Sequence, residues 1–264
     1  MSTQENVIER EPEEIAQQAE AIGEERLDRG VLEILITSVI GGGEVSVGAL
    51  ASMTVVGAAM QVLPGIDLFA TLAVAGLVFP IGFLFVILGR SELFTENFLI
   101  PVVAVFRGER SMGALIELWV LSWVGNLLGC AGTAVLLLIP EAVGQPILHG
   151  YAAYADYKLS IPPLGVFVSA VLAGGVMTTL TWSLMSVEHT VGRVLLICAG
   201  AYVLMAANLS HSIVSASLLF VGFLATPHGP GEVAAWLAVA TAGNLVGGLG
   251  LVTLFRLTQA HQQG

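Results

Sequence analysis

The sequence is poor in charged residues and in cysteine. Only 11% of its 264 residues are charged, whereas a soluble domain carries about 25%. The two cysteines, Cys130 and Cys198, both lie inside apolar runs. They provide neither a disulfide framework nor a metal-ligand spacing, so we interpret them as small buried hydrophobes.

Long apolar stretches make up most of the chain. Hydrophobic residues are 56% of it and the mean hydropathy is +0.87. A membrane span needs about 20 mostly apolar residues, and six stretches qualify. They cover residues 31–60, 67–89 with a continuation through 106, 112–139, 160–187, 191–224 and 232–257. The sequence therefore predicts an all-α membrane protein with six transmembrane helices over residues 30–257, followed by a short C-terminal tail over 258–264.

Acidic charge is concentrated at the N-terminus. Residues 1–29 hold nine acidic residues and three arginines, so −9 + 3 = −6 of the formal net charge of −11 lies there. A signal peptide needs a basic start and an apolar core, and a nucleic-acid arm needs positive charge. We expect an acidic cytoplasmic tail over 1–29, either a solvated helix or disordered, with too few apolar residues to bury a face. The membrane domain should assemble without it.

Two of the six spans are interrupted by polar residues. The second breaks at GRSELFTEN, residues 89–97, and the fifth at NLSHS, residues 208–212. Irregular backbone survives at membrane depth only where protein or a water-filled cavity satisfies it. Helices 2 and 5 are therefore predicted to be broken around a cavity.

An internal repeat relates the third and sixth spans. VGNLLGCAGTAVL (124–136) and AGNLVGGLGLVTL (242–254) align without gaps at an offset of 118. Small residues at this spacing let helices approach closely. Because three spans per half is an odd number, the halves, about 30–139 and 160–257, are expected to be inverted. Paired interruptions in such halves indicate a transport site.

Basic residues of the short loops predict the orientation. Arg107, Arg110, Arg193 and Arg256 share the side of the N-terminus, whereas Lys158 alone lies on the other. Cytoplasmic loops carry the excess of Lys and Arg, so both termini are expected to be cytoplasmic.

His211 lies at the second interruption, and an ionisable group within a span suggests function. Its imidazole can donate hydrogen bonds to an anion or pass a proton; structural bonding to a neighbouring helix is the alternative. Thr95 should face it from the first interruption if the halves are related, or else merely bond to backbone. Leu93 and Phe94 could form one apolar constriction of the pore. Phe79 and Phe83 could form a second one. Simple packing is the alternative role for all four residues.

Charged residues within the spans need partners. A charge at mid-bilayer costs at least about 2.5–3.5 kcal/mol on insertion scales. Glu44 in the first span and Arg90 at the first interruption are therefore expected to pair, and Glu92 or Glu96 are alternative partners for Arg90. Such a pair is purely structural in the simplest interpretation.

The stretches GRSELFTENFLIPVVAV and NLSHSIVSASLLF resemble the two signatures of the formate/nitrite transporter family. The GN-x-x-G segments of spans three and six are similar as well, and the resemblance covers about residues 28–257. It implies an aquaporin-like homopentamer in a prokaryotic inner membrane, with one pore per protomer.

The resemblance also implies site residues. Thr95 and His211 would face each other between two hydrophobic constrictions, and Lys158 before span four would draw anions in. Ser210 and Asn208 are further pore residues. The constrictions would contain Phe79, Phe83, Leu93, Phe94 and Leu204. Departures place the chain in a divergent branch: Ser210 replaces the family's usual Glu, Gly174 stands where Asn is expected, and Arg90 where a small residue is usual.

The function that follows is a channel or transporter for small monovalent anions, such as formate, nitrite or similar weak-acid anions, with His211 as proton donor. The alternative is a channel for a neutral solute or a cation on the same fold. We expect no cofactor, no metal and no nucleic-acid partner. The sequence offers no nucleophile–base set and no phosphate loop, so an enzyme is not expected. A membrane scaffold, the third class, would tolerate loss of His211.

Overall fold

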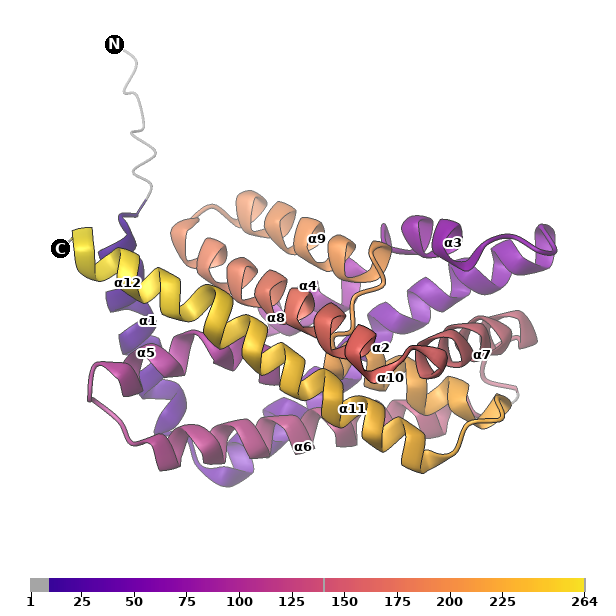
Figure 1. Cartoon of the computed structure of the whole chain (residues 1–264), viewed down its shortest axis with the longest axis horizontal. Helices are drawn as coiled ribbons and strands as arrows, with labels where there is room; N and C mark the ends of the chain where they lie inside the picture. The colour runs from indigo at the N-terminus through magenta and orange to yellow at the C-terminus, as the bar shows by residue number, and fades with distance from the viewer. Residues whose placement is uncertain (1–9, 140, 264) are drawn as a thin grey trace, which may run out of the picture.

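The computed structural model describes residues 10–139 and 141–263, and this part of the chain is helical with no strand. Most helices run roughly along one long axis, whereas α1 crosses the end of the bundle at which the two ends of the described chain lie (Figure 1). In chain order the elements are α1 (Pro12–Leu27), α2 (Val31–Val62), α3 (Leu68–Ala75), α4 (Pro80–Gly89), η1 (Phe94–Phe98), α5 (Ile100–Phe106), α6 (Met112–Leu137), α7 (Gln145–Ser160), α8 (Pro163–Ser186), α9 (Thr190–Ala206), α10 (Ser212–Gly222), η2 (Phe223–Ala225), α11 (Pro230–Leu245), η3 (Val246–Thr253) and α12 (Leu254–Gln263).

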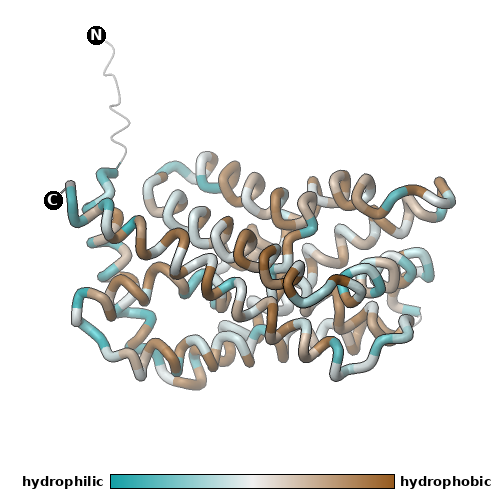
Figure 2. Tube along the Cα trace, viewed as in Figure 1, coloured by the Kyte–Doolittle hydropathy of each residue, from teal (hydrophilic) through white to brown (hydrophobic). Residues whose placement is uncertain are grey.

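Five segments of the described chain are long and apolar enough to cross a membrane: Val31–Val62, Leu68–Gly89, Met112–Leu137, Pro163–Ser186 and Pro230–Gln262. Apolar residues cover the body of the bundle, and hydrophilic residues gather towards its two ends (Figure 2). Large apolar side chains such as Leu77, Leu164 and Phe255 remain exposed, as expected for helices that face lipid. The remaining apolar helices are shorter, because the expected second and fifth spans are each divided.

Between the third and fourth expected spans the structure has a helix that the sequence did not predict. Helix α7 over Gln145–Ser160 contains polar residues such as His149 and Asp156, so it falls short of the 20 apolar residues that mark a span. It nevertheless packs against α2 and α10 and buries Tyr151 and Tyr154. Lys158 therefore lies on a helix rather than in a loop before span four.

Glycines bring α6 against α2 and α11 against α8. A Cβ added to Gly42 of α2 would lie 2.1 Å from the carbonyl oxygen of Asn126, and one added to Gly174 of α8 would lie 2.1 Å from that of Asn244. No real side chain tolerates such a distance, so both contacts need glycine. The Asn that the resemblance led us to expect at position 174 has no room there.

The acidic tail was expected to be a solvated helix or disordered; α1 is a helix, but the expectation that it is solvated is wrong. Its residues Ile15, Ala16, Ala19 and Gly23 are buried, and Ile15 and Ala19 pack in a cluster with Leu99, Val103, Trp182 and Met185. The few apolar residues of α1 share one helix face, and that face is enough to dock it on α5 and α8. The part of the tail over residues 1–9 lies outside the described residues.

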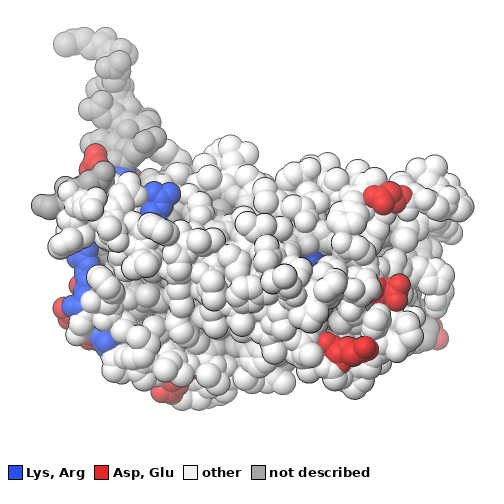
Figure 3. Space-filling view, viewed as in Figure 1, with Lys and Arg blue, Asp and Glu red and all other residues white. Residues whose placement is uncertain are grey.

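Charge is distributed unequally between the two ends of the bundle. Most Lys and Arg atoms visible in Figure 3 lie at the end that holds α1 and α12, whereas the opposite end shows acidic side chains. Arginines at the first end pair with α1: Arg107 contacts Glu13 and Glu20, and Arg110 contacts Asp28.

Candidate functional site

Helix α4 ends at Gly89, where the first interruption begins. Arg90 ends the helix in the left-handed conformation (φ 60°), and residues 91–93 have no regular secondary structure before η1. The side chain of Asn126 on α6 satisfies the freed backbone: its Oδ1 accepts the Phe94 N–H at 2.9 Å, and its Nδ2 donates to the carbonyl oxygens of Ser38 and Glu92, each at 2.8 Å.

The second interruption is held in the same way. Helix α9 ends at Ala206, and Asn208 is left-handed (φ 50°). Asn244 on α11 accepts the Ser212 N–H at 2.8 Å and donates to the carbonyl oxygens of Ala170 at 2.8 Å and Ser210 at 3.1 Å. The residues correspond at the offset of the sequence repeat: 244 − 126, 212 − 94 and 210 − 92 all equal 118. Ser210 therefore occupies the place that Glu92 has in the first half.

Thr95 and His211 meet between the two interruptions. Thr95 Oγ1 and His211 Nε2 are 2.8 Å apart, and both residues are fully buried. His211 also caps α10, because its Nδ1 accepts the Val214 N–H at 3.1 Å. A nitrogen that accepts carries no proton, so the hydrogen bonds assign a neutral imidazole whose one ring proton, on Nε2, is donated to Thr95.

Apolar side chains surround this contact. Phe83 packs edge-on against the His211 ring with centroids 6.2 Å apart, and Phe79 lies behind it at 5.5 Å from Phe83. Leu93, Phe94 and Leu204, the other proposed constriction residues, are all buried as well. The polar pair is thus buried beside an aromatic ring within the hydrophobic core, where an unpaired charge is costly.

Lys158 lies beside the second interruption and is completely buried. Its Nζ donates to the Asn208 carbonyl oxygen at 2.6 Å and lies 3.4 Å from Ser210 Oγ. The rings of Tyr154 and Trp236 flank the ammonium at 5.6 and 5.7 Å. The structure therefore brings together Lys158, Asn208 and Ser210, three of the residues expected to form the pore.

The expected Glu44–Arg90 pair is wrong for this structure. Within residues 10–139 and 141–263, Arg90 forms no ion pair with Glu44, Glu92 or Glu96. Arg90 is exposed, and one carboxylate oxygen of Glu44 has no hydrogen-bond partner. Glu92 and Glu96 pair with Arg26 and Arg29 instead.

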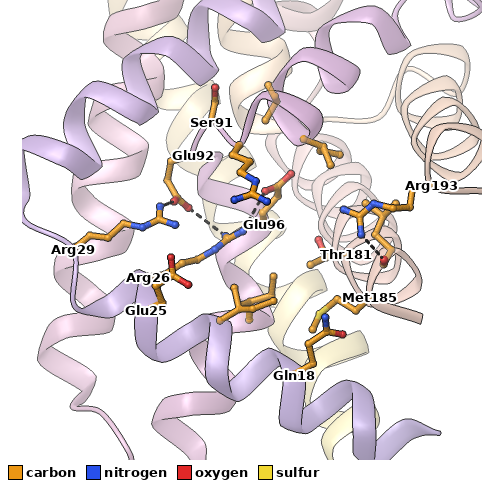
Figure 4. A pocket seen from close by; sticks show the side chains of 16 residues that line it. Gln18, Glu25, Arg26, Arg29, Ser91, Glu92, Glu96, Thr181, Met185 and Arg193 are labelled. Atoms are coloured by element: carbon orange, nitrogen blue, oxygen red, sulfur yellow. Dashed lines mark hydrogen bonds and ion pairs between the residues drawn. The ribbon is translucent and has the colours of Figure 1, made fainter. Parts of the chain in front are cut away.

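Arg26 of α1 and Arg29, which lies between α1 and α2, hold the carboxylate of Glu92. Arg29 Nη1 lies 2.8 Å from one oxygen and Arg26 Nη1 3.3 Å from the other, which also accepts from Asn97 Nδ2 at 2.7 Å. Arg26 reaches Glu96 at 3.9 Å. Arg26, Arg29, Glu92 and Glu96 line a pocket of about 390 Å³, whose far wall includes Arg193 (Figure 4).

Sequence reasoning did not assign several residues of this site. Asn126 and Asn244 appeared in the repeat, and their paired recurrence inside apolar helices was the signal for a shared role. Arg26 and Arg29 were counted only as tail charges, and Trp236 carries no sequence signal.

The fold and the site define a polytopic membrane protein in which two interrupted helix segments meet at a buried polar contact. The family model of the formate/nitrite transporters matches residues 13–258, and the chain belongs to this family of membrane transporters and channels, which is not an enzyme family. The match includes α1, so the resemblance begins earlier than the sequence motifs suggested.

Curated relatives and solved structures agree with this assignment. The chain is 29% identical over 199 residues, 75% of this chain and 70% of the relative, to a "Probable formate transporter" of Methanothermobacter thermautotrophicus. It is 24% identical to the "Uncharacterized transporter YrhG" of Bacillus subtilis, covering 96% and 95% of the two chains, and 24% identical to the "Inner membrane protein YfdC" of Escherichia coli, covering 90% and 75%.

Two solved structures share the fold. An "FNT family ion channel" superposes with a TM-score of 0.81 at 21% identity, covering 92% of this chain and 98% of that one. A "Pentameric formate channel with formate bound" gives a TM-score of 0.70 at 17% identity, covering 86% and 96%.

Proposed function

We propose that this protein conducts small monovalent anions of weak acids, such as formate or nitrite, through a pore that passes between Thr95 and His211. The observation that carries this function is the 2.8 Å contact of these two side chains, one from each interruption, inside an apolar enclosure. An anion that leaves water loses the hydrogen bonds of its hydration shell, and the bilayer offers no donors to replace them. The side chains of Thr95 and His211 can supply such donors.

The two halves are proposed to be inverted repeats with helices broken at positions 90–93 and 207–211. The equivalent hydrogen bonds of Asn126 and Asn244 support the repeat. The family relationship supports a homopentamer in a prokaryotic inner membrane, and the arginines near α1 support cytoplasmic termini.

The neutral tautomer of His211 suggests how an anion would pass. Because Nε2–H points to Thr95 Oγ1, the Thr95 hydroxyl proton is free to be donated to an anion beside the pair. A shared proton makes the anion resemble its neutral acid, whose desolvation costs less. If His211 passes its Nε2 proton to the anion through the Thr95 hydroxyl and remains neutral, Nδ1 must take up a proton from water that enters the pore, and that breaks the cap on Val214 N–H. Proton donation is therefore coupled to the first turn of α10.

Uptake by liposomes tests this function. Formate and nitrite uptake should be measured between about pH 5 and 8, the range in which an ordinary imidazole changes charge, for wild type, His211→Asn and Thr95→Ser. Asn is a favoured N-cap residue, so His211→Asn should assemble, but it cannot titrate or reach Thr95. We expect it to lose pH-dependent uptake, whereas Thr95→Ser, which keeps the hydroxyl, retains it. Wild-type uptake by His211→Asn at every pH would leave His211 as a structural residue.

Cation or neutral-solute passage is the second candidate, and the unpartnered carboxylate oxygen of Glu44 favours it. Sodium and glycerol in the same assay distinguish the two. Sodium flux that exceeds formate flux would overturn the anion assignment.

A further inference from the structure

The connection between η2 and α11 carries a histidine whose two ring nitrogens each face a carboxylate. His228 Nδ1 lies 3.2 Å from Oε2 of Glu232, and His228 Nε2 lies 3.6 Å from Oδ1 of Asp156. Glu232 belongs to the first turn of α11, whereas Asp156 belongs to α7. The imidazole, with its side chain 18% exposed, therefore lies between two helices that are far apart in the sequence.

Glu232 is held in place by its own helix. Its Oε2 also accepts the Gly229 N–H at 2.8 Å, and this contact caps the start of α11. A carboxylate only accepts hydrogen bonds, so Nδ1 of His228 carries the proton in its contact with Glu232. A neutral imidazole can keep its one proton on Nδ1, so this contact joins His228 to α11 whether the ring is charged or not.

The contact with Asp156, in contrast, depends on the charge of the ring. In a neutral imidazole with its proton on Nδ1, the His228 Nε2 presents a lone pair to the Asp156 carboxylate, and the two repel each other. In a protonated ring both nitrogens carry protons, and an N–H faces the carboxylate instead. Protonation therefore changes the link between α7 and the start of α11 from repulsive to attractive.

Few other groups compete for this ring. Within the described part of the chain, Asp156 and Glu232 are the ionisable side chains that pair with His228. The connection from η2 contributes the neutral hydroxyl of Thr226, which accepts the His228 backbone N–H at 3.4 Å. Lys158, two residues after Asp156 on α7, is buried and donates to the Asn208 carbonyl. The charge of His228 is thus matched by the two carboxylates.

The same two helices form the surroundings of Lys158. Trp236 lies four residues after Glu232 on α11, and the centroid of its ring is 5.7 Å from Lys158 Nζ on α7. An ammonium and an aromatic ring attract each other out to about 6 Å from the ring centroid. A small displacement of the start of α11 away from α7 therefore weakens this contact.

We propose that His228 is a positioning residue that ties the start of α11 to α7 when its ring is protonated, releases it when the ring is neutral, and thereby adjusts the spacing between Trp236 and Lys158. In the proposed topology His228 lies on the outside of the membrane, so it makes the channel respond to external pH separately from His211. This effect on flux deepens the proposed function and rests on it, whereas the tie between the helices does not.

Hydrogen exchange of the purified full-length protein in detergent tests the tie. Wild type and His228→Gln are compared at about pH 5.5 and again at about pH 7.5, on either side of the charge change of an ordinary imidazole. Comparison at equal pH cancels the pH dependence of the chemical exchange rate. At the lower pH the amides of residues 232–237 should exchange about 2- to 5-fold more slowly in the wild type, the range expected for a partly exposed ion pair. The difference should be lost as the pH rises and the ring loses its charge.

Two further variants identify the partner. Asp156→Asn removes the carboxylate on α7, so it should exchange like His228→Gln at the lower pH, and combining the two substitutions should add nothing. His149→Gln is the matched control, because His149 is an exposed histidine of α7 with no ion pair in the described structure; it should behave like the wild type. A difference between wild type and His228→Gln that is absent or equal at both pH values, or that persists in Asp156→Asn, would overturn the tie.

Formate uptake by liposomes tests the effect on flux, with the internal pH fixed and the external pH varied over the same range. The ratio of uptake between wild type and His228→Gln should change by up to about 5-fold, whereas the ratio between wild type and His149→Gln should stay constant. A ratio for His228→Gln that does not change refutes the positioning role and leaves formate conduction standing. A pH-dependent tie in a wild-type protein that conducts no formate refutes the proposed function and leaves the tie standing.

Discussion

Replacing Arg26 and Arg29 together by glutamine tests whether α1 is an integral part of the membrane domain. Glu92 is 2% exposed, and the two arginine side chains are 16% and 21% exposed. Removing the partners of a buried charge costs about 3–5 kcal/mol. The partial exposure of the arginines lets water reach the pair, so we take the lower value, about 3 kcal/mol.

The expected effect is a fall of roughly 6–12 °C in the unfolding temperature, because each kcal/mol corresponds to roughly 2–4 °C in a chain of this size. Thermal unfolding in detergent, followed by intrinsic tryptophan fluorescence, measures it. Arg107→Gln is the matched control: its pairs with Glu13 and Glu20 are partly exposed, and such pairs contribute at most about 1 kcal/mol.

A rescue variant makes the cause explicit. Adding Glu92→Gln to the Arg26→Gln/Arg29→Gln protein removes the stranded charge, so most of the lost stability should return, since neutral replacement of a buried ion pair is often tolerated. Equal stability of the double variant and the Arg107→Gln control, or no recovery with Glu92→Gln, would refute this account of Glu92. A truncated chain that begins at Asp28 should likewise be destabilised, contrary to the expectation from the sequence that the tail is dispensable.

Three further predictions follow from the fold. Gly174→Ala should prevent folding or assembly, because its Cβ would lie 2.1 Å from the Asn244 carbonyl oxygen. Gly132→Ala is the control and should be neutral, because nothing lies within 4 Å of its Cβ. Size-exclusion chromatography compares the two variants, and equal behaviour contradicts the close helix contact. Contact with Arg107 lowers the pKa of Glu13 below 4.5, and contact with Arg110 lowers that of Asp28 below 3.8. Both carboxylates therefore stabilise α1 docking above these ordinary values and lose that effect as the pH falls through their lowered ones; hydrogen exchange in α1 should rise there, and an unchanged rate argues against these pairs. A cysteine at position 228 should be labelled from outside the cell and one at position 109 from inside, and the reverse pattern would invert the proposed topology.

The sequence was sufficient for several features of the site. Low charge and long apolar stretches indicated a membrane protein, because the bilayer imposes length and composition on each span. The polar residues at 89–97 and 208–212 marked the places where α4 and α9 end, since lipid tolerates freed backbone groups only where protein satisfies them. The repeat at an offset of 118 paired Asn126 with Asn244, and symmetry between the halves suggested that Thr95 faces His211.

Only the tertiary structure decided what each polar group meets. Glu92 is bound by Arg26 and Arg29, which precede it by 66 and 63 residues, and no local pattern encodes a partner so distant. Helix α7 escaped notice because it is too polar to be a span, yet it carries Lys158 to Asn208 and Ser210. Periodicity and hydropathy define which face of a helix is apolar, but they do not define the surface that covers it. That pairing depends on the packing of all helices together, and it determines which charges of this protein meet a partner of opposite sign.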